Sequence, residues 1–192
     1  MAAVARKNLS AYPNVEIVVS SFEDWDLQGR EKSFDFVVSA TAFHWVDEKV
    51  RMLKAADALR DGDGALAVIS THHVKGGSEG FFAEVQPFYE RCGLAASFGM
   101  CLPAASNIAE DASEFERSGR FGPVEFRRYE WDEIYSTGEY LGLLLTYSNH
   151  RCLEEGARKE LFDSIAELID GKYQGRISKR YMAQLALAKK LC

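Results

Sequence analysis

The stretch SFDFVVSATAFHWVD, residues 33–47, decides the fold class of this chain. Residues 34–38 form a short, nearly continuous run of aromatic and β-branched side chains, which is typical of a strand covered on both faces in a parallel sheet. We therefore expect this strand to be central. It ends at small polar residues and leads through His44 and Trp45 to Asp47, where a helical pattern begins. Because ligands of open α/β sheets bind at the carboxyl ends of strands, residues 39–45 are the expected site.

The neighbouring segments predict an alternation of strands and helices. Residues 15–19 are predicted to form a strand, with residues 20–26 as the loop at its carboxyl end. A helix is predicted from Asp47 to a turn at residues 61–64, and a second covered strand follows over residues 65–69. Such connections suit parallel strands joined by right-handed crossovers, so the predicted fold class is α/β.

The middle of the chain is less regular. Residues 71–77 are predicted to be a loop, and residues 81–89 a helix that Pro87 kinks. The small, polar and aperiodic residues 92–122 are interpreted as a substrate lid, because long irregular inserts are more often lids than linkers. Residues 124–131 alternate strictly, which is typical of a strand nearer an edge.

Two further helices are predicted in the C-terminal part. Ser136 and Glu139 fit a capping box, which opens a helix that ends near residue 150. The apolar spacing over residues 161–169 indicates an amphipathic helix. Residues 177–191 are compatible with either a strand or a helix, because they are β-branched at first and then rich in Ala, Leu and Lys.

The composition narrows the class of protein. With 192 residues, of which 47% are apolar, the chain is long enough for a single domain, residues 1–192, with a real core. The net charge of −6 argues against a nucleic-acid or acidic-membrane surface, since phosphate binding needs concentrated Lys and Arg. No apolar stretch approaches the roughly 18 residues of a membrane span, and the first residues lack a signal-peptide core. We therefore expect a cytoplasmic protein with a small-molecule partner.

The other clusters of polar residues indicate no metal site and no disulfide framework. The four cysteines have no paired spacing, so neither a zinc site nor a disulfide framework is indicated. His72 and His73 are sequential neighbours and should point apart, which favours a solvated loop over a metal site. Glu23 and Asp24 are also neighbours, and are interpreted as one ligand contact and one solvated charge. No metal ligand is therefore predicted.

Three segments together resemble class I S-adenosylmethionine-dependent methyltransferases. They are FEDW at residues 22–25, residues 34–45 quoted above, and YLGLLLTYSNH at residues 140–150. The nearest branch is the type 11 group of small-molecule enzymes that includes trans-aconitate methyltransferase. The resemblance spans nearly the whole chain, and it implies a Rossmann-like sheet with helices on both faces.

The resemblance also implies roles for individual residues. The cofactor-binding residues would be Ser21, Phe22, Glu23, Ser39, Ala40, Thr41 and Trp45. The acceptor would contact Trp45, Tyr147 and His150, within a lid and acceptor region made of residues 92–122 and 136–150. His44 and His150 are the candidate catalytic residues for a hydroxyl or amine acceptor, whereas a carboxylate acceptor needs no general base. The structural alternatives are that Phe43 and Trp45 belong to the core and that His150 offsets the negative end of a helix.

One part of the family pattern is missing from this sequence. In the family, a strand, a glycine-rich turn and a second strand that ends in an acidic residue precede the helix predicted at residues 1–9. We therefore expect an N-terminally incomplete sheet with exposed edges, and self-association through those edges. Losing two hydrogen bonds to charged groups would weaken cofactor binding by about 3–6 kcal/mol.

The predicted function is methyl transfer from S-adenosylmethionine to a small-molecule acceptor, with a carboxylate among the candidates. The alternative is a catalytically inactive methyltransferase remnant or an interaction module that does not bind the cofactor. A different nucleotide-binding α/β domain, which would bind NAD, is a second rival.

Overall fold

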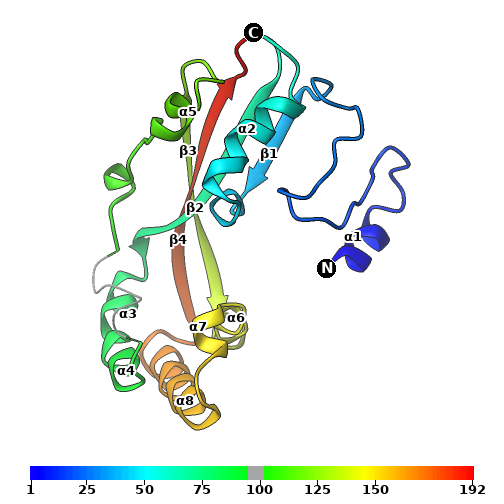
Figure 1. Cartoon of the computed structure of the whole chain (residues 1–192). Coiled ribbons are helices and arrows are strands. Elements are labelled where there is room, and N and C mark those ends of the chain that lie inside the picture. The colour runs from blue at the N-terminus through cyan, green and yellow to red at the C-terminus, as the bar shows by residue number, and fades with distance from the viewer. Residues whose placement is uncertain (95–101) are drawn as a thin grey trace. The chain divides into compact units, whose positions relative to one another are not determined.

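The computed structural model describes residues 1–94 and 102–192, and it contains a four-stranded sheet (Figure 1). The strands are β1 (Phe36–Ala40), β2 (Ala65–Gly77), β3 (Glu125–Ser136) and β4 (Arg176–Lys189). Their order in the sheet is β1-β2-β4-β3, and β1 pairs with β2 in parallel from Phe36↔Ala65 to Ala40↔Ile69. The predicted α/β class is confirmed.

The helices connect these strands along the chain. They are α1 (Ala2–Asn8), α2 (Glu48–Ala58), α3 (Glu79–Glu84), α4 (Gln86–Arg91), α5 (Ser113–Ser118), α6 (Thr137–Leu144), α7 (Ser148–Arg151) and α8 (Glu155–Lys172). The described residues also contain two short 3-10 turns, η1 (Phe43–Trp45) and η3 (Ala105–Asn107). In the part of the chain that the structure describes, no helix is both long and apolar enough to cross a membrane.

The chain divides into two compact units. Unit 1 comprises residues 1–69, 112–125 and 186–192, and unit 2 comprises residues 70–111 and 126–185. Of the predicted lid region at residues 92–122, residues 95–101 lie outside the described residues. The single domain, and the assignment of residues 92–122 and 136–150 to a lid and acceptor region, stay predictions.

Helix α2 forms the centre of the core in unit 1. Asp47 caps its N-terminus, because the Asp47 side chain accepts a hydrogen bond of 2.9 Å from the Lys49 amide. The buried face of the helix packs against strand residues and α5. The buried members of this core are Phe43, Met52, Ala55, Ala56, Leu59, Leu66, Phe115, Phe121 and Ala188. The helix predicted to begin at Asp47 is therefore confirmed.

Strand β1 lies at one end of the sheet order, so the prediction of a central strand is wrong. Its alternate side chains Phe36 and Val38 are 64% and 61% exposed, whereas Val37 packs against the core of unit 1. Only one face of β1 is therefore covered. Among residues 1–94 and 102–192, β2 is the one strand that pairs with β1, which leaves the other edge of β1 unpaired, as the resemblance led us to expect.

The strand predicted over residues 15–19 is also wrong. These residues form no secondary structure, and Val15, Val18 and Val19 are exposed (Figure 1). A strand is stabilised by hydrogen bonds to a neighbour and by burial of one face, and this segment has neither. Helix α1, which precedes it, buries no residue and has no side-chain cap.

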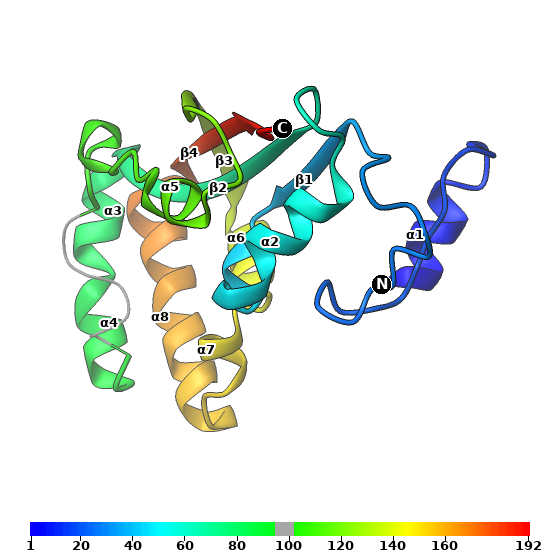
Figure 2. The same cartoon turned by 45° about the horizontal axis from the view of Figure 1, so that its top comes forward.

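Unit 2 is built around α8. Helices α3 and α4 follow one another next to α8 (Figure 2), and α8 contacts α4 and α6. The buried core residues are Phe81, Phe82, Val85, Tyr89, Tyr140, Leu144, Leu161, Ile165, Ile169 and Ile177. The single helix predicted over residues 81–89, with a kink at Pro87, is instead two helices, α3 and α4. The predicted capping box is present, with Ser136 and Glu139 bonded reciprocally.

Strand β2 contradicts one prediction, and β4 decides between two alternatives that the sequence left open. The loop predicted over residues 71–77 is wrong, because β2 continues to Gly77. Gly77 has φ of +63°, and a Cβ there would lie 2.4 Å from the Ser178 carbonyl oxygen, so only glycine permits this close approach to β4. Residues 176–189 form a strand, not a helix. The alternating residues 124–131 belong to β3, which lies at an edge as predicted.

Candidate functional site

The two loops predicted to bind the cofactor meet within unit 1. Glu23 Oε1 accepts a hydrogen bond of 2.9 Å from the Asp47 amide, and Lys54 Nζ donates one of 2.6 Å to the Glu23 carbonyl oxygen. Phe22 packs against the core that contains Phe43. The prediction that the loops around Phe22 and His44 meet is therefore confirmed, but no strand precedes residues 20–26, so the two loops do not end strands of one sheet. Their role as a cofactor pocket stays a prediction.

The carboxyl end of β1 presents small and exposed residues. Ser39 is half-buried, whereas Ala40 and Thr41 are exposed. Thr41 adopts a left-handed conformation with φ of +53°, and its amide donates a hydrogen bond of 2.8 Å to the Ile69 carbonyl oxygen. Short side chains at this strand end leave the backbone accessible to a ligand.

In the next turn, η1, one side chain is buried and two are exposed. Phe43 is buried, as its structural alternative predicted, but Trp45 is 82% exposed, so the core interpretation of Trp45 is wrong. His44 is exposed, and its ring centroid lies 5.0 Å from that of Trp45. An exposed aromatic ring at the carboxyl end of a strand suits stacking on a flat base or contact with a cationic sulfonium.

A site for S-adenosylmethionine would use an exposed strand end and an aromatic ring. Ala40, Thr41 and Trp45 are exposed, and Phe22 is half-buried. Ser21 already has a partner, because its hydroxyl donates a hydrogen bond of 2.7 Å to Asp24 Oδ2. Among residues 1–94 and 102–192, no group of three or more His, Cys, Asp or Glu side chains is placed to hold a metal ion.

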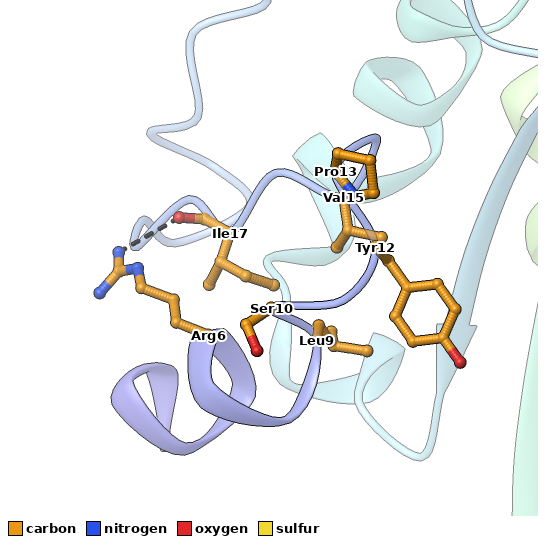
Figure 3. A pocket seen from close by; sticks show the side chains of 7 residues that line it. All are labelled: Arg6, Leu9, Ser10, Tyr12, Pro13, Val15 and Ile17. Carbon is orange, nitrogen blue, oxygen red and sulfur yellow. Dashed lines mark hydrogen bonds between the residues drawn. The ribbon is translucent and has the colours of Figure 1, made fainter.

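One cavity in unit 1 lies beside the loop at residues 20–26, and another lies apart from it. One of about 720 Å³ lies along α2 and includes Glu23, Lys49, Lys54 and Asp57 in its lining. A smaller one of about 340 Å³ is formed by α1 and the segment after it, where Arg6 donates a hydrogen bond of 3.2 Å to the Ile17 carbonyl oxygen (Figure 3). Neither lining includes residues 39–45.

His150, a candidate catalytic and acceptor residue, lies in the core of unit 2. It is fully buried, with Nε2 3.2 Å from the Tyr89 hydroxyl and Nδ1 3.0 Å from Asn149 Oδ1. Burial lowers the pKa of His150, as does the charge of Lys179, so the ring is neutral near pH 7. A neutral ring does not offset the negative end of a helix, which removes that alternative. The catalytic role of His150 stays a prediction.

Lys179, which contacts Tyr147, was not predicted from the sequence. Lys179 is 6% exposed, and its Nζ donates a hydrogen bond of 3.1 Å to the Tyr147 hydroxyl. The ammonium also lies 5.4 Å from the Tyr147 ring centroid and 4.9 Å from that of Tyr181. Burial lowers the pKa of Lys179 to about 8. The only sequence signal was that Lys179 follows Ile177 by two residues and so shares its face of a strand.

His72 and His73 lie on β2 and point apart, as expected for strand neighbours. His72 Nε2 lies 3.0 Å from the Ser70 hydroxyl, whereas the His73 ring packs edge-on against Phe82 at 4.7 Å. Burial lowers the pKa of His73 to about 3. The solvated-loop interpretation is therefore wrong for His73.

Residues 1–68 match the profile of the family described as Methyltransferase domain. The resemblance to class I S-adenosylmethionine-dependent methyltransferases is confirmed. A putative methyltransferase from Bacillus halodurans is 17% identical, with a TM-score of 0.51 over 100% of this chain and 79% of its own. A putative type II methyltransferase from Anaeromyxobacter dehalogenans is 19% identical, with a TM-score of 0.53 over 92% of this chain and 72% of its own. At these identities the two structures establish a shared methyltransferase fold.

A search of curated proteins found no match. The family match covers 68 of the 192 residues. That matched segment contains all of the predicted cofactor-binding residues, whereas Tyr147 and His150 lie beyond it.

Proposed function

We propose that this chain transfers the methyl group of S-adenosylmethionine to a small-molecule acceptor, with the cofactor held by the loops at residues 20–26 and 39–47. The observation that carries the proposal is the hydrogen bond between Glu23 Oε1 and the Asp47 amide, because it joins the two loops at the carboxyl end of β1. Ligands of open α/β sheets bind at such strand ends.

Each residue at this rim has a proposed part. The Ser39, Ala40 and Thr41 backbone contacts the methionine part of the cofactor, and Phe22 packs beside the adenine. The bound cofactor supplies a methyl group made electrophilic by a sulfonium sulfur. Trp45 faces that positive charge with its ring, which stabilises a cation by about 0.5–2 kcal/mol.

The acceptor decides whether His44 acts in catalysis. Transfer to a carboxylate needs only alignment with the methyl group. A hydroxyl or amine acceptor must lose a proton, and a ring nitrogen of the exposed His44 is the candidate to take it.

Calorimetric titration with S-adenosylhomocysteine tests the cofactor part of the proposal. We expect binding by the full chain, and a loss of roughly fivefold in affinity for Trp45→Ala, which corresponds to about 1 kcal/mol. Tyr129→Ala is the matched control, because Tyr129 is also an exposed aromatic residue but lies on β3. Titration with NAD serves as a comparison.

The same titrations separate the rival functions. A chain that binds neither ligand is the inactive remnant or interaction module, and a chain that binds NAD but not the adenosyl ligand is a different nucleotide-binding domain. Either result overturns the proposal. Equal affinity of the Trp45→Ala and Tyr129→Ala variants for S-adenosylhomocysteine would remove Trp45 from the site.

A further inference from the structure

Strand β1 directs the backbone groups of three residues away from β2. The Thr41 amide donates a hydrogen bond of 2.8 Å to the Ile69 carbonyl oxygen, so the backbone groups of Thr41 face β2. Because the backbone groups of alternate residues point to the same edge of a strand, every second residue before Thr41 also faces β2. The residues between them therefore direct their N–H and C=O groups to the other edge of β1. They are Phe36, Val38 and Ala40.

The side chains of the same three residues form an exposed apolar face. Phe36 and Val38 are 64% and 61% exposed, and Ala40 is exposed, whereas Val37 and Ser39 are half-buried. Within the described ranges, residues 1–94 and 102–192, β2 is the one strand that pairs with β1. An unpaired strand edge beside an exposed apolar face is a template for a strand of another chain.

The other end of the sheet order carries a different kind of edge. Strand β3 is rich in charged residues, which are Glu125, Arg127, Arg128, Glu130, Asp132 and Glu133. Charged side chains on an edge strand oppose pairing with another chain. Strand β1 contains no charged residue and no proline. The sequence therefore protects the edge at β3 and leaves the edge at β1 open to pairing.

Strand β1 is complementary to itself when two copies lie antiparallel. If Val38 of one copy lies opposite Val38 of the other, then Phe36 of each copy lies opposite Ala40 of its partner. Each of these pairs is hydrogen-bonded, because its members are the residues whose N–H and C=O groups point to the open edge. The largest side chain of the strand then meets one of the smallest, and the two valines form a β-branched cross-strand pair. This register satisfies the backbone groups of all three edge residues.

We propose that the open edge of β1 binds the same edge of a second copy of this chain, antiparallel and with Val38 at the twofold axis. Such a contact joins identical surfaces, so it closes at two copies. All of its residues lie in unit 1. The proposal goes beyond methyl transfer and does not depend on it, because the contact involves no cofactor and no acceptor.

Residues 15–19 are the rival occupant of this edge, because they are β-branched and form no strand. They suit the edge less well than a second β1. Val18 and Val19 are both exposed, but neighbours in a strand point to opposite faces, so only one of them could extend the apolar face of β1. The Ile17 carbonyl oxygen also accepts a hydrogen bond of 3.2 Å from Arg6, which a ladder through Ile17 would have to replace. Pairing between two β1 strands breaks no such contact.

Sedimentation equilibrium of the full chain at about 5–500 µM tests the association. We expect the weight-average mass to rise from that of one chain toward that of two chains. The expected dissociation constant is on the order of 10–100 µM, because an edge of five residues is short beside standard interfaces of about 1,200–2,000 Å².

Charge substitutions at the twofold axis test the register. Val38→Lys and Val38→Glu should each weaken association at least fivefold, because each places two like charges opposite one another. An equimolar mixture of the two variants should associate at least fivefold more tightly than either variant alone, since the opposing charges then attract. Ile134→Lys is the matched control, because Ile134 is a 64% exposed aliphatic residue of β3, and it should keep wild-type association. Thermal unfolding checks that each variant is folded.

Amide hydrogen exchange, followed by NMR, tests the pairing without any substitution. The amides of Phe36, Val38 and Ala40 should exchange severalfold more slowly at the highest protein concentration than at the lowest. The amides of Val37 and Ser39 should change little, because they bond to β2 in one copy as in two. This measurement keeps the proposal testable even if a variant at Val38 fails to fold.

Four results would overturn the inference. They are a single-chain mass across the whole range, wild-type association in Val38→Lys, a mixture that associates no more tightly than the separate variants, and growth beyond two copies. Val18→Lys distinguishes the rival occupant, because Val18 is 52% exposed in the segment at residues 15–19. Association that is lost in Val18→Lys and kept in Val38→Lys would assign the contact to that segment and overturn the pairing of β1 with itself.

Discussion

The buried charge of Lys179 predicts an unusual dependence of stability on pH. Its pKa is about 8 in the folded chain and 10.5 when unperturbed, with burial as the cause. At about 1.36 kcal/mol for each pH unit, the charged lysine destabilises the fold by about 3 kcal/mol below pH 8. Between pH 8 and 10.5 the unfolded chain binds more protons than the folded chain, so this penalty disappears as the pH rises.

Replacing Lys179 with Met removes both the charge and its titration. At pH 7 we expect Lys179→Met to be more stable than wild type by about 1–3 kcal/mol, since the hydrogen bond to Tyr147 is lost but an unpaired buried charge is removed. That advantage should shrink by about 2 kcal/mol between pH 7 and pH 9.5. The comparison between variant and wild type cancels the tyrosine titrations common to both chains.

Urea unfolding at half-unit steps from pH 7 to pH 9.5 measures the difference. Lys189→Met is the matched control, because Lys189 is an exposed lysine at the end of the same strand and its replacement should leave the pH dependence unchanged. A constant difference between Lys179→Met and wild type across this range would refute the reasoning. It would mean that the ammonium is hydrated or paired in solution.

Three further predictions concern single contacts. Ser136→Ala removes the capping box with Glu139 and should lower stability by about 1 kcal/mol, measured as a lower midpoint of thermal unfolding. Glu114→Gln replaces the carboxylate that Arg51 holds at 2.5 and 2.7 Å, and it should lower the urea-unfolding free energy by about 1–3 kcal/mol. His44→Ala should slow methyl transfer to a hydroxyl or amine acceptor. The midpoint of thermal unfolding should stay unchanged, because His44 is exposed. An unchanged turnover rate would show that His44 has no catalytic role.

The sequence predicted elements that depend on local contacts. The capping box at Ser136 and the N-cap at Asp47 involve residues no more than a turn apart, so their geometry follows from the residues alone. The prediction failed at residues 15–19, where a β-branched run has no strand beside it. Strand propensity describes a fit to a neighbour, and the sequence of one segment does not reveal whether that neighbour exists.

The sequence also predicted some parts of the candidate site and missed others. Phe22 and His44 were placed at a common rim because two parallel strands were expected to end on one side of a sheet. The loops do meet through Glu23 and Asp47, but residues 15–19 form no strand, so that rule does not explain the contact. The exposure of Trp45 was not predictable, because an aromatic residue after a strand suits a core and a binding surface equally well. Lys179 was missed because alternation gives two faces without saying which one is buried.

The location of the candidate residues separates the test of the cofactor site from substitutions in unit 2. Every predicted cofactor residue lies in unit 1, and Tyr147, His150 and Lys179 lie in unit 2. The core of each unit is formed by its own residues, so a neutral substitution at Lys179 removes a charge from unit 2 without altering the packing of Phe22 or Phe43 in unit 1. Intact adenosyl binding in Lys179→Met is therefore expected, because the change is confined to unit 2. A loss of adenosyl binding in Trp45→Ala reports on the cofactor site, because Trp45 is exposed and supports no core.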